Sequence, residues 1–378
     1  MQRTNGRMRI VIAGGGTGGH VTPAIAVHDE LKRRDIETEF LWIGSTTGIE
    51  GKEAARAGIP FTTIQTGKFR RYFDLKTVTD AGRLPIGIVQ AASQLRRFQP
   101  DVVFSTGGFV SVPTVVAAQF FAPVVTHEQT AIVGLANKIN AKFAKVFAVS
   151  YESTMASANG LGRKMIVTGN PVRAALKTGN ADRAREHFGF TPDLPIIYVT
   201  GGARGASAIN QRITAILPHL LERAQVVHQT GDRAANPDYD LAVAERARLP
   251  EHLQARYAPR EFIGSEISDL YASASLVIGR AGAGTIAEIA YLGLPAILIP
   301  LPGSGGGEQD RNADLLARCG GAIVLSQPDA TADRLKHEVL GLLADQARLS
   351  AMAAAARSIG REDAATRLAD LLLQHCRK

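Results

Sequence analysis

Near its start the chain reads Arg9-Ile-Val-Ile-Ala-Gly-Gly-Gly-Thr-Gly-Gly-His20, a β-branched run that ends in a glycine-rich turn. A similar run, Ile196-Ile-Tyr-Val-Thr-Gly-Gly-Ala-Arg-Gly-Ala206, occurs in the second half. Each run suits a strand buried on both faces, and its glycines allow a tight turn into a helix. Such a turn points backbone N–H groups at an anion such as phosphate. The pair predicts two similar α/β domains facing a cleft, as in an enzyme that joins two substrates.

The composition is that of an ordinary globular protein large enough for two cores. The chain has 378 residues, of which 45% are hydrophobic and 21% charged. Its two cysteines, Cys319 and Cys376, indicate neither a disulfide framework nor a metal site, so we expect a reducing compartment. No signal peptide is expected at the start, and the longest apolar stretch, 110–125, is too short and interrupted to span a membrane.

Positive charge is concentrated in the first half of the chain. Residues 1–169 carry 20 Lys and Arg against 12 Asp and Glu, whereas residues 170–378 carry 23 of each kind. We therefore expect an anionic partner for the first half. Within it, residues 68–97 interleave basic and apolar side chains, which suits an anionic membrane surface. Nucleic acid is disfavoured because no nucleic-acid-binding motif accompanies the charge, and an ordinary basic helix remains the alternative.

Strands and helices alternate along both halves. A helix is predicted over 23–34. Strands are predicted at 9–13, 39–43, 101–105, 123–126, 196–200, 225–229, 276–279 and 296–300. This alternation favours parallel sheets covered by helices on both faces. The segment Thr168-Gly-Asn-Pro-Val172 reads as a turn between the domains.

A third small-residue turn stands in Val277-Ile-Gly-Arg-Ala-Gly-Ala-Gly-Thr-Ile-Ala-Glu288. Its small residues would let a diphosphate approach a helix N-terminus closely. Glu288 is placed to reach ribose hydroxyls, although it could equally be a first-turn acid that favours the helix dipole. The first turn, by contrast, lacks the acidic residue that a dinucleotide-binding dehydrogenase requires at the end of the second strand, because that strand ends in Ile43-Gly-Ser-Thr46 and the first acid after it is Glu50.

Polar side chains follow several predicted strands and would gather at one edge of a sheet. Either His20 or Glu128 could act there as a general base toward a hydroxyl. Alternatively, His20 caps a helix and Glu128 is only hydrogen-bonded at the end of a strand. Glu308 and Gln309 follow the flexible loop 302–307 and could bind a sugar or simply begin a helix. Asp238-Tyr-Asp240 imitates a metal site, but its position after Pro237 indicates helix capping, and no metal is predicted.

Taken in order, the motifs resemble the MurG family over essentially the whole chain. They are Gly15-Gly-Thr-Gly-Gly-His20, Gly48-Ile-Glu50, Thr106-Gly-Gly-Phe-Val-Ser111, His127-Glu-Gln129, Gly169-Asn-Pro-Val-Arg173, Gly201-Gly202, Arg280-Ala-Gly-Ala283, Gly293-Leu-Pro295 and Gln309 with Asn312-Ala313. Members of this family transfer N-acetylglucosamine from UDP-GlcNAc to lipid I, the undecaprenyl-diphosphate-linked muramoyl-pentapeptide, and so make lipid II.

The resemblance implies a GT-B fold with two Rossmann-like domains, at 1–169 and 170–359, and a C-terminal helix within 360–378 that completes the first. Donor-binding residues would be Thr17, Gly18, Gly19, Arg173, Gly202, Ala203, Arg204, Phe262, Ile263, Ala281, Gly282, Ala283, Gly284, Thr285, Glu288, Glu308 and Gln309. Acceptor-binding residues would be Gly15, Gly16, Gly107, Gly108, Thr130 and Asn137.

The resemblance further implies an inverting displacement in which His20, with Glu128 as competitor, takes the proton of the acceptor hydroxyl while UDP leaves. No cofactor and no obligatory metal are expected. The enzyme would work at the cytoplasmic face of the inner membrane, near other cell-wall synthesis proteins. Ala203, Arg204, Thr130 and Glu308 depart from the usual family residues. Another GT-B enzyme, such as a glycolipid synthase or a sugar epimerase, and a non-catalytic scaffold are the alternatives.

Overall fold

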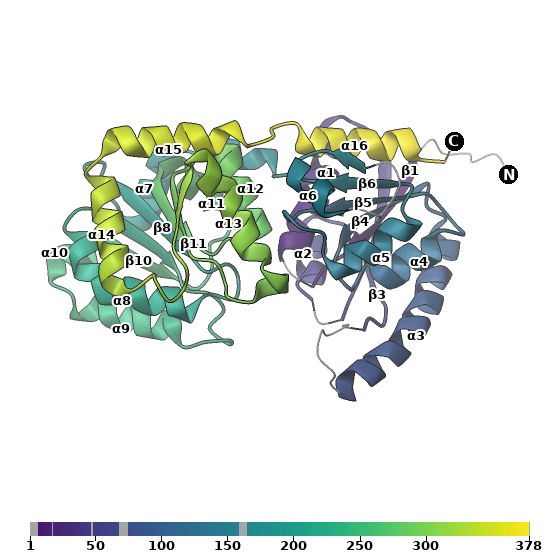
Figure 1. Ribbon diagram of the computed structural model, residues 1–378, viewed down its shortest axis with the longest axis horizontal. Coiled ribbons are helices and arrows are strands. Elements are labelled where there is room, and N and C mark those ends of the chain that lie inside the picture. Colours follow the sequence, from purple (N-terminus) through teal and green to yellow (C-terminus); the bar gives the residue numbers. More distant parts are fainter. Residues whose placement is uncertain (1–6, 17, 47, 68–74, 159–164, 378) are drawn as a thin grey trace. The chain divides into compact units, whose positions relative to one another are not determined.

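The computed structural model describes residues 7–16, 18–46, 48–67, 75–158 and 165–377, with side chains omitted for 75–82 (Figure 1). The chain forms two compact units. The first comprises Met1–Arg173 and Arg361–Lys378, and the second comprises Ala174–Gly360. Arg173, expected to bind the donor with the second domain, therefore belongs to the first unit. Each unit is an α/β structure with its own sheet and core.

The first unit contains a seven-stranded parallel sheet in the order β3-β2-β1-β4-β5-β6-β7. Its strands are β1 (Met8–Gly14), β2 (Thr38–Gly44), β3 (Phe61–Thr63), β4 (Val102–Gly107), β5 (Val124–Glu128), β6 (Val146–Val149) and β7 (Met165–Val167). The four predicted strands are confirmed, each within two residues at its ends. The sequence reasoning missed β3, β6 and β7, because strands of three or four residues carry too little pattern to be recognised.

Helices cover both faces of this sheet. They are α1 (Gly18–Arg33), α2 (Glu50–Arg56), α3 (Leu75–Phe98), α4 (Val112–Ala118), α5 (Leu135–Phe143), α6 (Glu152–Ser157) and α16 (Ala364–His375). The start predicted for the first helix, Pro23, is wrong because α1 begins at Gly18. Pro23 lies inside α1, where its nitrogen has no hydrogen to donate to the Gly19 carbonyl and its ring crowds that carbonyl. Proline is most common in the first turn of a helix, which is why the sequence favoured a start at this residue.

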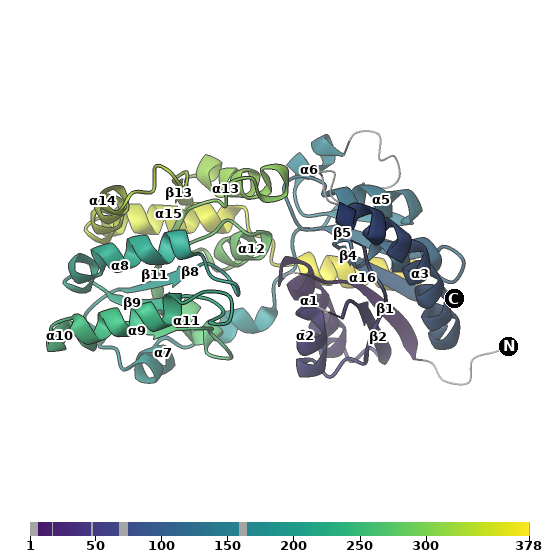
Figure 2. The same cartoon turned by 90° about the horizontal axis from the view of Figure 1, so that it is seen from below.

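The C-terminal helix α16 packs beside α1 on the first unit (Figure 2). Leu368 and Leu372 are fully buried in the same cluster as Ile10. Arg34 at the end of α1 donates to Asp370 at 2.5 Å and to the Thr366 carbonyl at 3.0 Å. Apolar burial and an ion pair thus both join the two ends of the chain.

The second unit contains a six-stranded parallel sheet in the order β10-β9-β8-β11-β12-β13. Its strands are β8 (Ile196–Thr200), β9 (Gln225–Gln229), β10 (Tyr257–Arg260), β11 (Ala274–Gly279), β12 (Ala296–Leu298) and β13 (Ala322–Val324). The four predicted strands are again confirmed, while β10 and β13 were missed.

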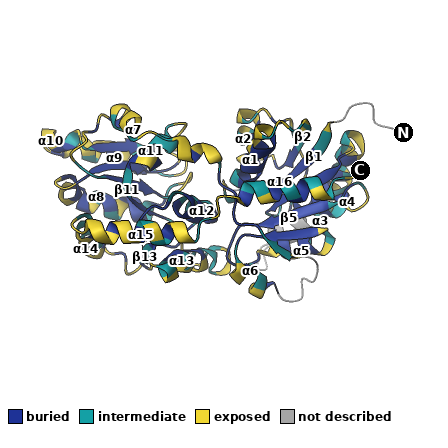
Figure 3. Ribbon diagram, turned by 90° about the horizontal axis from the view of Figure 1, so that it is seen from above, coloured by how far each residue is buried: buried dark blue, intermediate teal, exposed yellow. Residues whose placement is uncertain are grey.

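The helices of the second unit lie on both faces of this sheet. They are η1 (Ala174–Thr178), α7 (Ala181–Phe188), α8 (Ser207–Leu221), α9 (Asp238–Arg248), α10 (Glu251–Gln254), α11 (Ile267–Ser273), α12 (Ala283–Leu292), η2 (Ser304–Gly306), α13 (Glu308–Cys319), α14 (Ala332–Leu343) and α15 (Gln346–Ser358). Figure 3 shows both sheets buried and the outer helix faces exposed. Asp238 and Asp240 lie in the first turn of α9, and Asp238 accepts from Asn210 rather than capping the helix.

Both sheets reverse their strand order at one point, after β1 and β4 in the first unit and after β8 and β11 in the second. Open α/β sheets bind ligands outside the carboxyl ends of the strands at such a point. The glycine-rich turns at 14–19 and 107–108 follow β1 and β4, and those at 201–205 and 280–284 follow β8 and β11. Each unit therefore places two glycine-rich turns side by side at its switch point.

Candidate functional site

His20 lies just after the first glycine-rich turn, and its ring orientation is set by two acceptors. Its Nδ1 is 2.8 Å from the Thr106 carbonyl oxygen and 3.2 Å from Gln129 Oε1. Because both partners can only accept, Nδ1 carries a proton, and in the neutral ring Nε2 is the nitrogen that holds the lone pair. The ring is half-buried. The site thus holds a histidine in the tautomer that a general base requires.

Gly108 lies close to the other edge of the His20 ring. A Cβ built at Gly108 would lie 3.1 Å from His20 Cδ2, 3.4 Å from Nε2 and 2.9 Å from the Gly15 carbonyl oxygen. Its φ of +77° also favours glycine. The turns after β1 and β4 therefore meet closely, with the imidazole ring against them.

Glu128, the competing base, is 2% exposed at the end of β5. Its carboxylate accepts from Thr130 N (3.1 Å), Thr130 Oγ1 (2.8 Å), Gly134 N (2.9 Å) and Asn137 Nδ2 (3.0 Å). A carboxylate offers about four lone-pair positions, so this one is saturated. Thr130 and Asn137, expected at the acceptor, are themselves buried around Glu128. This arrangement gives Glu128 the role of ordering the 128–137 segment.

Glu50 is a completely buried carboxylate beneath the first glycine-rich turn. It accepts from Gly16 N at 2.9 Å, Ser45 N at 2.8 Å and Ser45 Oγ at 2.6 Å. A Cβ on Gly15 would lie 2.4 Å from Glu50 Cδ, so no side chain fits there. The sequence reasoning noted Glu50 within a motif and as the first acid after the second strand, but it missed this role.

In the second unit, the turn after β8 is anchored through its carbonyl groups. Three consecutive carbonyls accept hydrogen bonds: Gly202 from Gln229 Nε2 at 3.1 Å, Ala203 from Asp232 N at 3.0 Å and Arg204 from Asn236 Nδ2 at 3.0 Å. All three turn residues are exposed. Their carbonyls thus bind the last residue of β9 and the loop that follows it, which holds the turn in place from that side.

The turn after β11 leads into α12, whose N-cap Gly282 makes no side-chain cap. Ala281 and Ala283 are buried, and Gly282, Gly284 and Thr285 are half-buried. A Cβ on Gly284 would meet nothing within 4 Å. The small residues therefore leave open space beside the N-terminus of α12.

Arg280 does not point its guanidinium at this space. It donates to the carbonyls of Ile299 and Pro300, both at 3.0 Å, and to Gln327 Oε1 at 2.7 Å. Burial, with Arg212 nearby, lowers the pKa of Arg280. Arg280 therefore ties the end of β12 to the 327 region and orders the start of the following loop.

The remaining predicted donor residues follow the carboxyl ends of strands in the same sheet. Glu288 on α12 accepts a hydrogen bond from the Tyr271 hydroxyl at 2.7 Å. Phe262, after β10, is 49% exposed, whereas Ile263 is buried and donates its N–H to Gln229 Oε1 at 3.3 Å. Glu308 and Gln309 begin α13, and Gln309 Oε1 accepts from Leu301 N at 2.9 Å. The contacts of Tyr271 and Gln229 were missed by the sequence reasoning.

The first unit brings together Gly15, Gly16, Gly108 and His20, with Gly107 beside Asn137. Gly18 and Gly19 begin α1. Arg173 is half-buried in this unit, and Thr17 lies outside the described residues.

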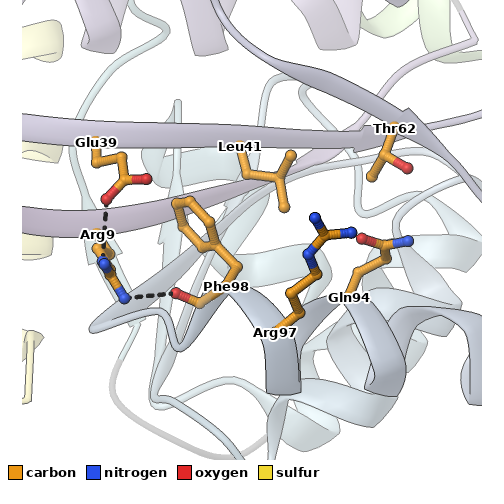
Figure 4. Close-up of a pocket in the computed structure, with 7 residues that line it drawn as sticks. All are labelled: Arg9, Glu39, Leu41, Thr62, Gln94, Arg97 and Phe98. Carbon is orange, nitrogen blue, oxygen red and sulfur yellow. Dashed lines mark hydrogen bonds and ion pairs between the residues drawn. The ribbon is translucent and has the colours of Figure 1, made fainter.

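Three further findings concern a metal site, a membrane-spanning helix and a pocket. Among the described residues, no group of three or more His, Cys, Asp and Glu is placed to hold a metal ion. In the same part of the chain, no helix is both long and apolar enough to cross a membrane. A pocket of about 430 Å³ in the first unit contains none of the predicted site residues (Figure 4). It is lined by Arg9, Glu39, Leu41, Thr62, Gln94, Arg97 and Phe98.

Comparison with known proteins gives consistent matches over both units. The glycosyltransferase family 28 N-terminal domain matches residues 10–149, and the C-terminal domain of that family matches residues 196–368. The UDP-N-acetylglucosamine–N-acetylmuramyl-(pentapeptide) pyrophosphoryl-undecaprenol N-acetylglucosamine transferase of Treponema denticola is 37% identical, with 96% of each chain covered. The protein of the same name from Listeria welshimeri is 36% identical, covering 97% of this chain and 99% of its own.

Solved structures agree with these matches. The crystal structure of Acinetobacter baumannii MurG is 26% identical, with a TM-score of 0.72 and coverage of 97% of this chain and 99% of that one. A UDP-GlcNAc 2-epimerase from Neisseria meningitidis, 14% identical with a TM-score of 0.66 and coverage of 97% and 100%, shares the fold alone. The chain therefore belongs to the MurG family within glycosyltransferase family 28.

Proposed function

We propose that this protein transfers N-acetylglucosamine from UDP-GlcNAc to the C4 hydroxyl of the muramoyl-pentapeptide in lipid I, giving lipid II. Membership of the family supports the reaction. The observation that carries the chemistry is the tautomer of His20, whose Nδ1–H is bound to Thr106 and Gln129 and whose Nε2 holds a lone pair. A sugar epimerase is not favoured, because its resemblance to this chain is one of fold alone.

In the proposed reaction, His20 Nε2 takes the proton of the acceptor hydroxyl. The hydroxyl oxygen then bonds to the anomeric carbon while the bond from that carbon to the UDP oxygen breaks, which inverts the configuration. General bases of this kind typically contribute about 10²- to 10⁴-fold to the rate. The two acceptors at Nδ1 stabilise the imidazolium that results, because a hydrogen bond from a charged donor is stronger than one from a neutral donor. Saturated Glu128 holds the neighbouring segment in place.

We assign the donor to the second unit. Glu288 would accept the ribose hydroxyls, and Phe262 with Ile263 would contact the uracil. The diphosphate would lie at the open N-terminus of α12, where Ala281–Thr285 present small residues and the helix dipole favours an anion. The Gly202–Arg204 turn would border the donor, and Glu308 and Gln309 would read the sugar. Preorganised backbone donors stabilise a leaving diphosphate, so no obligatory metal and no cofactor are proposed.

We assign the lipid I diphosphate to the first unit, above the turns at Gly15–Gly19 and Gly107–Gly108. The Glu50 contact shows which backbone N–H group is not available to this diphosphate. Gly16 N–H already donates to a buried carboxylate, so it is committed to holding the turn. The anion would then be bound by other donors of the two turns and by the N-terminus of α1. Arg173, by contrast, would assist a phosphate of the donor.

We further propose that residues 68–97 hold the enzyme against the anionic cytoplasmic face of the inner membrane. Residues 68–74 lie outside the described structure. In the described part of α3, Ile86 is 48% and Val89 69% exposed, and Arg96 and Arg97 follow in the last turn. Exposed apolar and basic side chains on one helix suit an interfacial helix. We expect cell-wall synthesis proteins as partners, and we do not expect nucleic acid.

The direct test supplies labelled UDP-GlcNAc and a short-chain lipid I analogue to the purified protein. We expect a labelled disaccharide product attached to the lipid diphosphate. A chain that binds UDP-GlcNAc but forms no such product would contradict the proposal. Free N-acetylmannosamine or its UDP derivative as the product would instead establish an epimerase.

A further inference from the structure

A buried tyrosine holds the carboxylate that is assigned to the ribose. The Tyr271 hydroxyl on α11 donates to Glu288 Oε2 on α12 at 2.7 Å. Tyr271 is 5% exposed and Glu288 is half-buried. A hydrogen bond from a neutral donor to a carboxylate is shorter and stronger than one between neutral groups. The contact therefore selects one orientation of a side chain that otherwise has three rotatable bonds.

The hydroxyl is itself held rigidly by packing. The ring of Tyr271 meets the ring of Tyr198 edge to face, with centroids 5.6 Å apart and planes at 78°. Tyr198 on β8 is 2% exposed, and its own hydroxyl donates to Gln229 Oε1 at 3.0 Å. Burial, with Glu288 and Glu266 nearby, raises the pKa of Tyr198, so it stays a neutral donor. The pair of rings fixes where the Tyr271 oxygen lies.

The same network reaches other residues assigned to the donor. Gln229 Oε1 also accepts from Ile263 N at 3.3 Å, and Gln229 Nε2 donates to the Gly202 carbonyl at 3.1 Å. Gln229 is 4% exposed. One set of buried side chains thus connects Gly202, Ile263 and, through the paired tyrosine rings, Glu288.

We propose that Tyr271 is a positioning residue for donor binding, which acts by preorienting the Glu288 carboxylate toward the ribose hydroxyls. This inference rests on the proposed function, in which Glu288 binds the ribose. Preorientation removes part of the rotamer entropy that binding would otherwise cost. The ribose is remote from the anomeric carbon, so the interaction is equally strong in the ground state and the transition state. Losing it raises KM and leaves kcat unchanged.

The test compares Tyr271→Phe with the wild-type chain on two donors, UDP-GlcNAc and an analogue whose ribose lacks both hydroxyls. The wild-type chain should prefer UDP-GlcNAc by about 100-fold in kcat/KM, as expected for losing hydrogen bonds to a charged group. Y271F should raise the KM for UDP-GlcNAc about tenfold with kcat within about twofold, and should reduce the preference between donors to about tenfold.

Two further variants separate this inference from the function on which it rests. Glu288→Ala should abolish the preference between donors, and an E288A chain that keeps it would overturn the ribose assignment. Tyr257→Phe is the matched control, because Tyr257 is 1% exposed and its hydroxyl lies 2.9 Å from His228 Nδ1, not from a site residue. It should keep the full preference. A folded Y271F chain that keeps the full preference while E288A loses it would overturn the positioning role.

Discussion

Glu50→Gln tests whether a buried carboxylate holds the first glycine-rich turn. Glu50 is 0% exposed and accepts from Gly16 N, Ser45 N and Ser45 Oγ. Glutamine keeps the volume but replaces one carboxylate oxygen with an NH₂ group, so at least one of the three donors loses its acceptor. A buried donor left unsatisfied costs about 1–3 kcal/mol, and the loss of charge weakens the remaining bonds, giving about 2–3 kcal/mol in total.

That loss should be visible in thermal unfolding. In a unit of this size 1 kcal/mol shifts Tm by about 2–4 °C, so we expect a fall of about 4–12 °C. The KM for the lipid I analogue should rise, because the turn beside His20 is no longer held. Glu53→Gln is the matched control on the same helix, since the Glu53–Arg56 pair is solvent-exposed and worth about 0–1 kcal/mol. An E50Q chain that melts and turns over like E53Q would refute the reasoning.

Three other predictions concern the first unit. Gly108→Ala should lower kcat about 10- to 100-fold by displacing the His20 ring. Gly58→Ala is the control and should leave kcat unchanged, because Gly58 has a similar positive φ, +70° against +77°, but its Cβ would meet nothing within 4 Å. Burial lowers the pKa of His127 to about 4. Between pH 6.5 and pH 4 the unfolded chain therefore binds a proton that the folded chain does not bind, and the free energy of unfolding falls as the pH drops. His127→Gln should therefore remove about 2 kcal/mol of the loss between pH 7 and pH 5, measured by urea unfolding, and an unchanged pH dependence would contradict this. Arg34→Ala should lower the free energy of unfolding by about 1–2 kcal/mol and speed the proteolytic removal of α16, because the hydrogen bonds to Asp370 and Thr366 are lost. An unchanged rate of proteolysis would show that the apolar contacts alone hold the helix.

The sequence predicted the central strands and the fold, but not the contacts that organise the site. β1 and β8 were recognisable because β-branched runs ending in glycines suit buried parallel strands. The Glu50 contact joins the start of α2 to the turn after β1, and no local pattern records which backbone N–H a distant carboxylate will reach. The Tyr271–Glu288 bond likewise depends on how α11 packs against α12. Glu128 was a plausible base by residue type, and His20 is favoured by contacts that the structure shows: the lone pairs of Glu128 are saturated, and Nδ1 of His20 donates to two acceptors.

The central claim is that His20 Nε2 is the base of the transfer. The most direct measurement is the turnover of His20→Asn with labelled UDP-GlcNAc and the lipid I analogue, because asparagine can still donate to the Thr106 carbonyl but has no atom in place of Nε2. We predict that kcat falls at least about 100-fold while UDP affinity stays within about twofold of the wild-type value. Turnover within about threefold of the wild type would contradict the account and assign the proton to another group.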